Sequence, residues 1–189
     1  MTTENTPTTA STASTASTAS SEGTGDEKTA AYLPEHTPRI SVAELAPDLY
    51  RALARADAAT RKGLDPVIGE LVKIRASQIN HCAFCLDMHT KDALEMGESV
   101  ERIIQLSAWE ESKHYYTAKE IAAIELTEAI TVLTDGFVPD EVYEKAATHF
   151  DEKELAHLIG AITVINAWNR LSVAARNVPG HYVPGSLGH

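Results

Sequence analysis

The apolar residues that follow Ile40 recur every three or four positions, and no stretch alternates apolar and polar residues with the period of two typical of a half-buried strand. The pattern is clearest after Asp151, where one helix face would carry Leu155, Leu158, Ile159, Ile162, Ile165 and Trp168. A stripe this broad is expected on a helix that lies centrally in a bundle. The sequence therefore predicts an all-α fold, a compact bundle of several helices.

Capping residues mark the starts of the earlier helices. Ser41 can cap a helix over 42–60, with Pro47 near its first turn. The apolar face of this helix would consist of Leu45, Leu49, Leu53 and Ala56. Asp65 and the proline after it start a second helix, which should end near Asn80.

Other residues mark helix ends and further starts. The segment 82–96 should form a helix that stops at Gly97, because glycine accepts the left-handed conformation that closes many helices. A helix from Thr117, whose spacing to Glu120 fits a capping box, should stop near Gly136. Short helices are expected after Ser99 and after Pro139.

The N-terminal region differs sharply in composition from the rest of the chain. Residues 1–38 contain the repeat TASTASTASTAS and then a polar, acidic run, with too few large apolar side chains to offset the entropy of ordering. We expect a disordered tail over 1–38 and one helical domain over 39–189.

The charge balance excludes some classes of partner. The net charge is −11, and the 16 basic residues are scattered among 27 acidic ones, which argues against nucleic acid and against anionic membrane surfaces. The N-terminus lacks the positive start and apolar stretch of a secretory signal, and no apolar run reaches the roughly 18 residues of a membrane span. We expect a cytoplasmic protein, in which two cysteines seldom form a structural disulfide.

Both cysteines lie in the segment NHCAFCLDMH, residues 80–89, at the start of the helix predicted over 82–96. At about 100° per residue, Cys82, Cys85 and His89 would share one helix face. His89, one turn beyond Cys85, could take the proton of that thiol, and the helix N-terminus would stabilise the thiolate. Cys82 would then be the second thiol of a pair that cycles between dithiol and disulfide.

Glu70 is the candidate that orients His89. In one straight helix Glu70 would lie about 18 Å from Cys82, so a turn is required to bring the carboxylate near the imidazole. The segment 78–81 is a plausible place for that turn. Folded in this way, the three residue types would make a carboxylate–histidine–thiol relay of the activated-nucleophile type.

Two alternatives to redox chemistry stay open. Cys82, Cys85, His89 and the adjacent His81 are residue types that bind zinc, although structural zinc sites usually draw ligands from two separated segments. The cysteines could also be small buried residues of the core. A c-type haem attachment is excluded, because Leu86 stands where the histidine of that motif would follow the second cysteine.

The spacing from Glu70 to Cys82, Cys85 and His89 is E-x11-C-x2-C-x3-H. It resembles the signature of alkylhydroperoxidase D-like proteins of the carboxymuconolactone decarboxylase family. The resemblance extends through LVKIRASQINHCAFCLDMH and reappears in INAWNRL, so it covers most of the chain after about residue 40. It implies the all-helical fold of that family, assembled as trimers or hexamers.

The resemblance also implies a thiol-dependent peroxidase that needs no metal or organic cofactor. Cys85 would attack the hydroperoxide and become a sulfenic acid, and Cys82 would donate a proton and then resolve it as a disulfide. His89 and Glu70 would relay protons, and a dithiol reductant would restore the pair. Phe84 departs from the pattern, since the founding peroxidases carry a histidine between the cysteines. Lactone decarboxylation is the weaker expectation, because that branch of the family lacks the cysteine pair.

Overall fold

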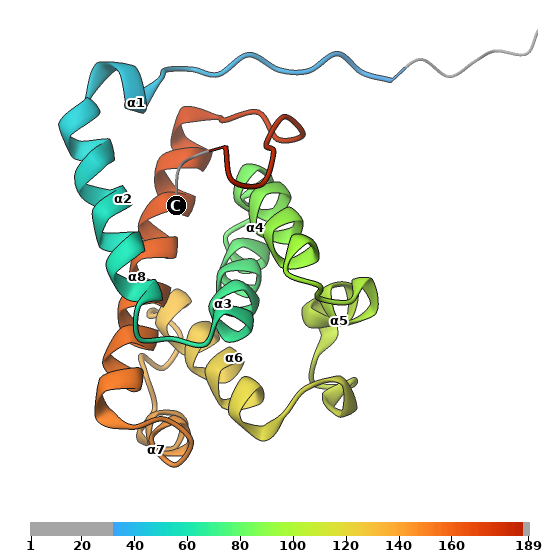
Figure 1. Ribbon diagram of the computed structural model, residues 1–189, viewed down its shortest axis with the longest axis vertical. Coiled ribbons are helices and arrows are strands. Elements are labelled where there is room, and N and C mark those ends of the chain that lie inside the picture. The colour runs from blue at the N-terminus through green and yellow to red at the C-terminus, as the bar shows by residue number, and fades with distance from the viewer. Residues whose placement is uncertain (1–31, 187–189) are drawn as a thin grey trace, which may run out of the picture. The chain divides into compact units, whose positions relative to one another are not determined.

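The computed structural model describes residues 32–186, and all regular structure in that range is helical (Figure 1). The chain divides at Pro34 into two units, and the helices all belong to the unit that begins at Glu35. The α-helices are α1 (Val42–Leu45), α2 (Pro47–Arg61), α3 (Pro66–Ile79), α4 (Ala83–Glu95), α5 (Val100–Gln105), α6 (Ala118–Thr131), α7 (Asp140–Ala147) and α8 (Glu152–Ala175). The predicted all-α fold is confirmed, and most of the expected tail lies outside the described residues.

The helix predicted over 42–60 is two helices. Pro47 is the first residue of α2, and Ala46 before it leaves the helical region with φ −134° and ψ 60°. The cause is steric, because a proline ring disfavours helical backbone at the preceding residue. The prediction of one continuous helix, with Pro47 near its first turn, was therefore wrong.

The first half of the apolar stripe predicted on this segment does not face the core, whereas Leu53 and Ala56 are half-buried. Leu45 is 73% exposed and Leu49 is 56% exposed. Helix α2 instead packs against α8 through its C-terminal half, where Asp57 and Thr60 are buried. Its apolar side chains Leu49, Ala52, Leu53 and Ala56 line an open groove together with residues of α8.

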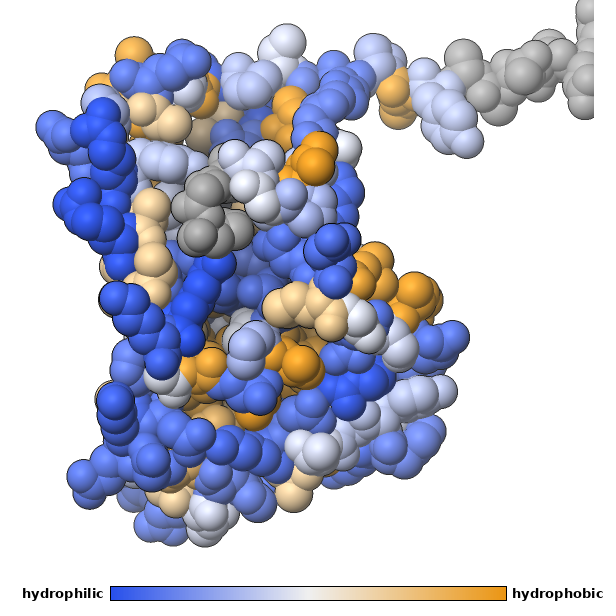
Figure 2. All heavy atoms as spheres, in the orientation of Figure 1, coloured by the Kyte–Doolittle hydropathy of each residue, from blue (hydrophilic) through white to orange (hydrophobic). Residues whose placement is uncertain are grey.

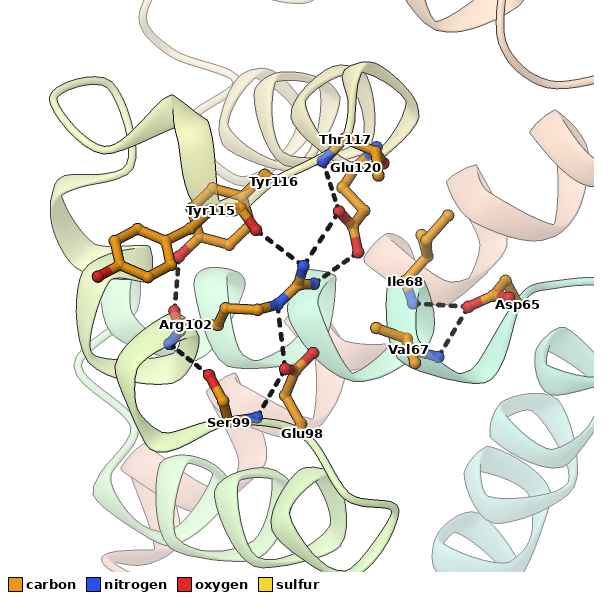
Figure 3. Close-up of polar contacts among 10 residues, drawn as sticks. All are labelled: Asp65, Val67, Ile68, Glu98, Ser99, Arg102, Tyr115, Tyr116, Thr117 and Glu120. Atoms are coloured by element: carbon orange, nitrogen blue, oxygen red, sulfur yellow. Dashed lines mark hydrogen bonds and ion pairs between the residues drawn. The ribbon is translucent and has the colours of Figure 1, made fainter.

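Helix α3 is the centre of the bundle, since it packs against α4, α6 and α8 (Figure 1). Asp65 caps it by accepting from the backbone N–H groups of Val67 and Ile68 at 2.9 and 3.2 Å (Figure 3). Residues on all sides of α3 are buried, from Ile68 through Ser77 with the one exception of Arg75. A helix enclosed in this way presents any polar side chain it carries to the interior.

The turn between α3 and α4 reverses the chain within 80–82, which overlaps the predicted segment 78–81 but begins later because α3 continues to Ile79. The backbone N–H of Cys82 donates to the carbonyl of Ser77 at 3.0 Å, and that of His81 donates to the carbonyl of Gln78 at 3.2 Å. With His81 at φ 52°, this is the Schellman arrangement in which one residue turns left-handed to close a helix. Histidine takes the place that glycine usually holds, so the turn carries a side chain, and that side chain is exposed.

Arg102 ties α5 to the start of α6 (Figure 3). Its guanidinium pairs with Glu120 at 2.5 Å and with Glu98 at 3.0 Å, and it donates to the carbonyl of Tyr115 at 2.8 Å. Glu120 also closes the predicted capping box with Thr117. This network holds the wall of the core that contains Trp109 and Tyr116.

The C-terminal end of α4 lies where the sequence predicted it, whereas that of α6 does not. Gly97, at φ 90°, closes α4 as predicted. Helix α6 ends at Thr131, well before the glycine at 136 that was expected to stop it, because Val132 already leaves the helical region. The intervening residues form turns on the surface.

Helix α8 buries the stripe that identified it. Leu158, Ile162 and Ile165 have no exposed surface, and Leu155 is nearly enclosed. The helix is long and apolar enough to cross a membrane by length and composition alone, but here it packs against α2, α3 and α6 as a core helix. In Figure 2, apolar side chains gather near the middle of the visible face, among hydrophilic ones.

Candidate functional site

The four residues of the predicted site are all buried. Glu70 comes from the middle of α3, Cys82 is the residue that caps α4, and Cys85 and His89 lie in the first two turns of α4. Their exposed fractions are 7%, 1%, 1% and 2% respectively. The turn at 80–82 brings the two helices together, so residues far apart along an extended chain share one part of the interior.

Glu70 and His89 are in direct contact. The Nδ1 atom of the imidazole lies 2.8 Å from Oε2 of the carboxylate. The other carboxylate oxygen, Oε1, accepts from Nζ of Lys73 at 3.0 Å, and the lysine side chain is only 1% exposed. The carboxylate therefore holds the ring of His89 from one side while a buried ammonium holds the carboxylate from the other.

This environment keeps Glu70 ionised. Burial alone pushes the pKa of the carboxyl upward, but the hydrogen bond with His89 and the ammonium of Lys73 outweigh burial and lower the pKa to about 2. An ionised carboxylate fixes the orientation of the imidazole and leaves Nε2 available for chemistry. Among the described residues no hydrogen bond joins His89 to either thiol, so a proton would pass between them through a water molecule or a substrate.

The cysteines form a free dithiol at the start of α4. Cys82 Sγ accepts a hydrogen bond from the backbone N–H of Cys85 at 3.3 Å, so this thiol takes the place that a serine or aspartate usually has at a helix N-terminus. Both sulfur atoms belong to a small apolar cluster with Ala76 and Ile165, covered by Phe84 and Trp168.

The two thiols differ in acidity. Hydrogen bonding from the Cys85 thiol lowers the pKa of Cys82 to about 7, against the opposing effect of burial, and Asn169 and Ser172 add to the lowering. The same hydrogen bond, together with burial, raises the pKa of Cys85. The hydrogen bond between the two thiols therefore favours ionisation of Cys82 over ionisation of Cys85.

Amide and hydroxyl groups of α8 hold the turn between α3 and α4. Asn169 has no exposed surface, donates to Oγ of Ser77 at 3.0 Å and accepts from Nδ2 of Asn80 at 2.9 Å. Asn80 also donates to Oδ1 of Asn166 at 2.9 Å. Helix α8 thus fixes the turn from which the first cysteine emerges, and it places a polar group beside that sulfur.

A cavity of about 340 Å³ lies next to the thiols. It is lined by Tyr50, Phe84, Trp168, Leu171 and Ser172, with residues of α1 and the segment after α8 on its outer side. Phe84 and Trp168 cover the thiol cluster, and Ser172 hydrogen-bonds the sulfur of Cys82. The cavity is largely apolar, so it suits an organic molecule better than a charged one.

The arrangement of possible metal ligands does not match the zinc set considered from the sequence. Among the described residues, one group of three has its ligand atoms within 4.8 Å of one another, and it consists of Glu70, His89 and Asp92. Neither cysteine belongs to this group, and His81 is exposed on the turn. Lys73 and Tyr182 already bond two of the three candidate ligands.

Sequence reasoning missed several residues around the site. Lys73 stands three residues after Glu70, a spacing that fits an ion pair in water, but the burial of this pair was not predicted. Asn169 lies in the INAWNRL stretch, where a polar residue interrupts an apolar stripe. Asp92 and Tyr182, which bond at 2.7 Å, are far apart in sequence, and no local signal connects them.

The chain matches one protein-family model and is similar to two bacterial proteins. Residues 47–129 match the model of the carboxymuconolactone decarboxylase family. The chain is 43% identical over 140 residues to the uncharacterized protein YdfG of Bacillus subtilis, covering 74% of this chain and 95% of that protein. It is 31% identical over 119 residues to the uncharacterized protein YnjA of Escherichia coli, covering 63% and 64%.

A solved structure has the same fold. It is a protein of unknown function from Agrobacterium tumefaciens, provisionally described as the antioxidant defence protein AhpD. The TM-score is 0.73 and the sequence identity 35%, over 78% of this chain and 99% of the other.

Proposed function

Because the chain belongs to the carboxymuconolactone decarboxylase family, with an AhpD-like fold, and carries a buried dithiol beside an oriented imidazole, we propose that it is a thiol-dependent peroxidase. The observation that carries the proposal is the 2.8 Å contact between Glu70 and His89 across α3 and α4. Two cysteines that only filled the core would not need a buried histidine, held by a carboxylate, on the same helix.

In the proposed reaction, the thiolate of Cys82 attacks one oxygen of a hydroperoxide and the O–O bond breaks. The thiol of Cys85 supplies the proton that leaves with the alcohol. Cys82 is now a sulfenic acid, and the thiolate of Cys85 attacks its sulfur, forming the disulfide. The departing hydroxide takes a proton from His89 and leaves as water. Two electrons pass from the two sulfur atoms to the peroxide, and one proton is taken up from solution.

This order reverses the one expected from the sequence, in which Cys85 attacks first. That expectation rested on the nearness of His89 to Cys85 along the helix. The proposal gives Cys82 the first attack because its pKa of about 7 leaves it ionised in part at neutral pH, whereas the pKa of Cys85 is raised. His89 keeps a role beside Cys85, as the group that returns the proton in the second step.

The proposal also covers the reductant, the cofactors and the oligomeric state. A dithiol reductant would reopen the disulfide, which suits the reducing conditions of the cytoplasm. No metal or organic cofactor takes part in the proposed steps. The exposed apolar side chains of α1 and α2, such as Leu45 and Leu49, support the expectation of a homo-oligomer.

Titration of the reduced protein with an organic hydroperoxide tests the proposal. We expect two thiols to disappear per equivalent of peroxide, with formation of one intramolecular disulfide. The variant Cys85→Ser should stop at a sulfenic acid on Cys82, which mass spectrometry detects after trapping. The variant His89→Asn should be at least about tenfold slower, since a general acid–base group typically contributes that much or more.

A matched control is available in the exposed histidine of the turn. The variant His81→Asn keeps a residue that tolerates positive φ and should react at the wild-type rate. Unreacted thiols after excess hydroperoxide would refute the peroxidase proposal. Decarboxylation of a lactone substrate that persists in the Cys82→Ser/Cys85→Ser variant would favour the other branch of the family.

A further inference from the structure

Three aromatic rings line the cavity beside the thiols. They belong to Tyr50 of α2, Phe84 of α4 and Trp168 of α8. The rings of Tyr50 and Trp168 meet edge to face, with centroids 5.0 Å apart and an angle of 66° between their planes. This is a favourable arrangement of two aromatic rings, and a ring supplied by a ligand can pack against them in the same way. Leu171 and Val42 add aliphatic surface to the lining.

Polar groups of the lining adjoin the sulfur of Cys82. Ser172, which is 5% exposed, lines the cavity and hydrogen-bonds this sulfur. Its hydroxyl also accepts from Nδ2 of Asn177 at 3.3 Å, and Asn177 is itself a lining residue. Among the described residues that line the cavity, none is charged. A neutral molecule can therefore place a polar group near the sulfur and its carbon atoms against the rings, without the cost of burying an unpaired charge.

The segment before α1 forms an outer wall of the cavity and is fixed to the end of α8. The backbone N–H of Arg39 donates to the carbonyl of Ala175 at 2.8 Å, and the guanidinium of Arg39 donates to the carbonyl of Ala174 at 3.2 Å. Carbonyls in the last turn of a helix lack partners within the helix, so these bonds satisfy groups that need them. Pro38, next to Arg39, lines the cavity, which is thus bounded here too and has a volume of about 340 Å³.

We propose that this cavity holds the carbon group of the substrate, and that Tyr50, Trp168 and Leu171 make the chain selective for neutral hydroperoxides with a compact aromatic group. The inference rests on the proposed peroxidase function. The oxygen that Cys82 attacks would lie near Ser172, and the ring of the substrate would pack against the aromatic lining. Hydrogen peroxide has no carbon group to place in the cavity, so it gains none of this binding energy.

Two variants that narrow the cavity from different elements test the selectivity. Leu171→Trp adds volume on α8, and Val42→Trp adds volume on α1. Val173→Trp is the matched control, because it adds an indole to α8 at a residue that is 49% exposed and lies outside the lining. The measured quantity is the ratio of kcat/KM for cumene hydroperoxide to kcat/KM for hydrogen peroxide.

We expect this ratio to exceed one in the wild type and to fall by about tenfold or more in both narrowed variants, since a hydrophobic pocket discriminates by such factors over small changes in size. The ratio in Val173→Trp should stay at the wild-type value. A wild-type ratio in both narrowed variants, or an equal fall in the control, would overturn the inference.

Binding of cumyl alcohol, the unreactive alcohol of the same shape, gives a readout that does not depend on peroxidase activity. The chain has two tryptophans, and Trp109 belongs to a different core cluster from Trp168. In the reduced wild-type protein, the alcohol should shift the NMR signal of the Trp168 indole N–H and leave that of Trp109 in place. An unmoved Trp168 signal, or equal shifts of both, would overturn the inference. If the Trp168 signal moves but neither hydroperoxide is reduced, the proposed function is refuted, whereas the cavity is still shown to bind a neutral aromatic molecule.

Discussion

The ammonium of Lys73 lies 3.0 Å from Oε1 of Glu70, and the lysine side chain is almost completely enclosed. A buried charge is tolerated only when a partner compensates it, so each member of this pair depends on the other. The contact with His89 adds a functional reason for a charged group at a place where apolar residues would pack equally well. If the chain is the proposed peroxidase, stability and activity are coupled at this position.

The first prediction concerns that coupling. Glu70→Gln and Lys73→Met should each lower the free energy of unfolding by about 3–5 kcal/mol, because each leaves an uncompensated charge in the interior. The double variant should recover most of the loss, to within about 1–2 kcal/mol of wild type. Urea unfolding of the four proteins measures the coupling. The pair Lys145–Glu125, which lies at the surface with side chains 45% and 23% exposed, serves as the control, and its single variants should change stability by less than about 1 kcal/mol.

The second prediction is the loss of stability in acid. The folded state lowers the pKa of Glu70 from 4.5 to about 2, so the carboxylate stabilises the protein above pH 4.5 and this contribution disappears as the pH falls toward 2. A shift of this size corresponds to about 3 kcal/mol. Unfolding curves recorded at several pH values should show this loss in the wild type. The Glu70→Gln/Lys73→Met variant should lose about 3 kcal/mol less over the same range.

The third prediction separates the two thiols. The serine hydroxyl of a Cys85→Ser variant can donate to Cys82 Sγ as the Cys85 thiol does, and Asn169 and Ser172 stay in place, so this variant should retain some thiolate at neutral pH, visible by ultraviolet absorbance. Cys82→Ser should show no thiolate at that pH, since burial disfavours the charged form of the remaining thiol. A thiolate near neutral pH in Cys82→Ser, and none in Cys85→Ser, would return the first attack to Cys85.

The fourth prediction tests the polar contacts of α8. Asn169→Leu keeps the approximate size of the side chain but removes one buried hydrogen-bond partner each from Ser77 and Asn80. The free energy of unfolding should fall by about 2–4 kcal/mol. The pKa of Cys82 should rise, because the hydrogen bond from the amide is lost. Ser172→Ala should raise that pKa as well, with a smaller cost in stability.

Much of the helical fold could be predicted because its signals are local. Asp65, Ser99 and Thr117 cap helices where the sequence placed them, and Gly97 ends one. The break at Pro47 was missed because a proline near a helix start is compatible with both one helix and two. The exposure of Leu49 could not be foreseen, since periodicity identifies an apolar face but not what covers it.

For the candidate site, spacing was enough to predict the meeting of Glu70 with His89, because a turn was the only way to bring them together. The acidity of the thiols could not be read from spacing. It depends on a backbone N–H, on Asn169 and on burial, all of which follow from the packing of α8 against the turn. The position of Tyr182 could not be predicted either, since the segment after α8 has no sequence pattern that indicates where it packs.

The left-handed turn at His81 also limits how much the length of the segment between α3 and α4 can vary. Helix α4 leaves the turn with a defined rotation about its own axis, and each added or deleted residue changes that rotation by about 100°. A single insertion between Glu70 and Cys82 would therefore aim the thiols and the imidazole at different neighbours while leaving both helices intact. The number of residues between Glu70 and Cys82 therefore determines which way the side chains of α4 point. A protein with a different number of residues there would need another partner for the histidine.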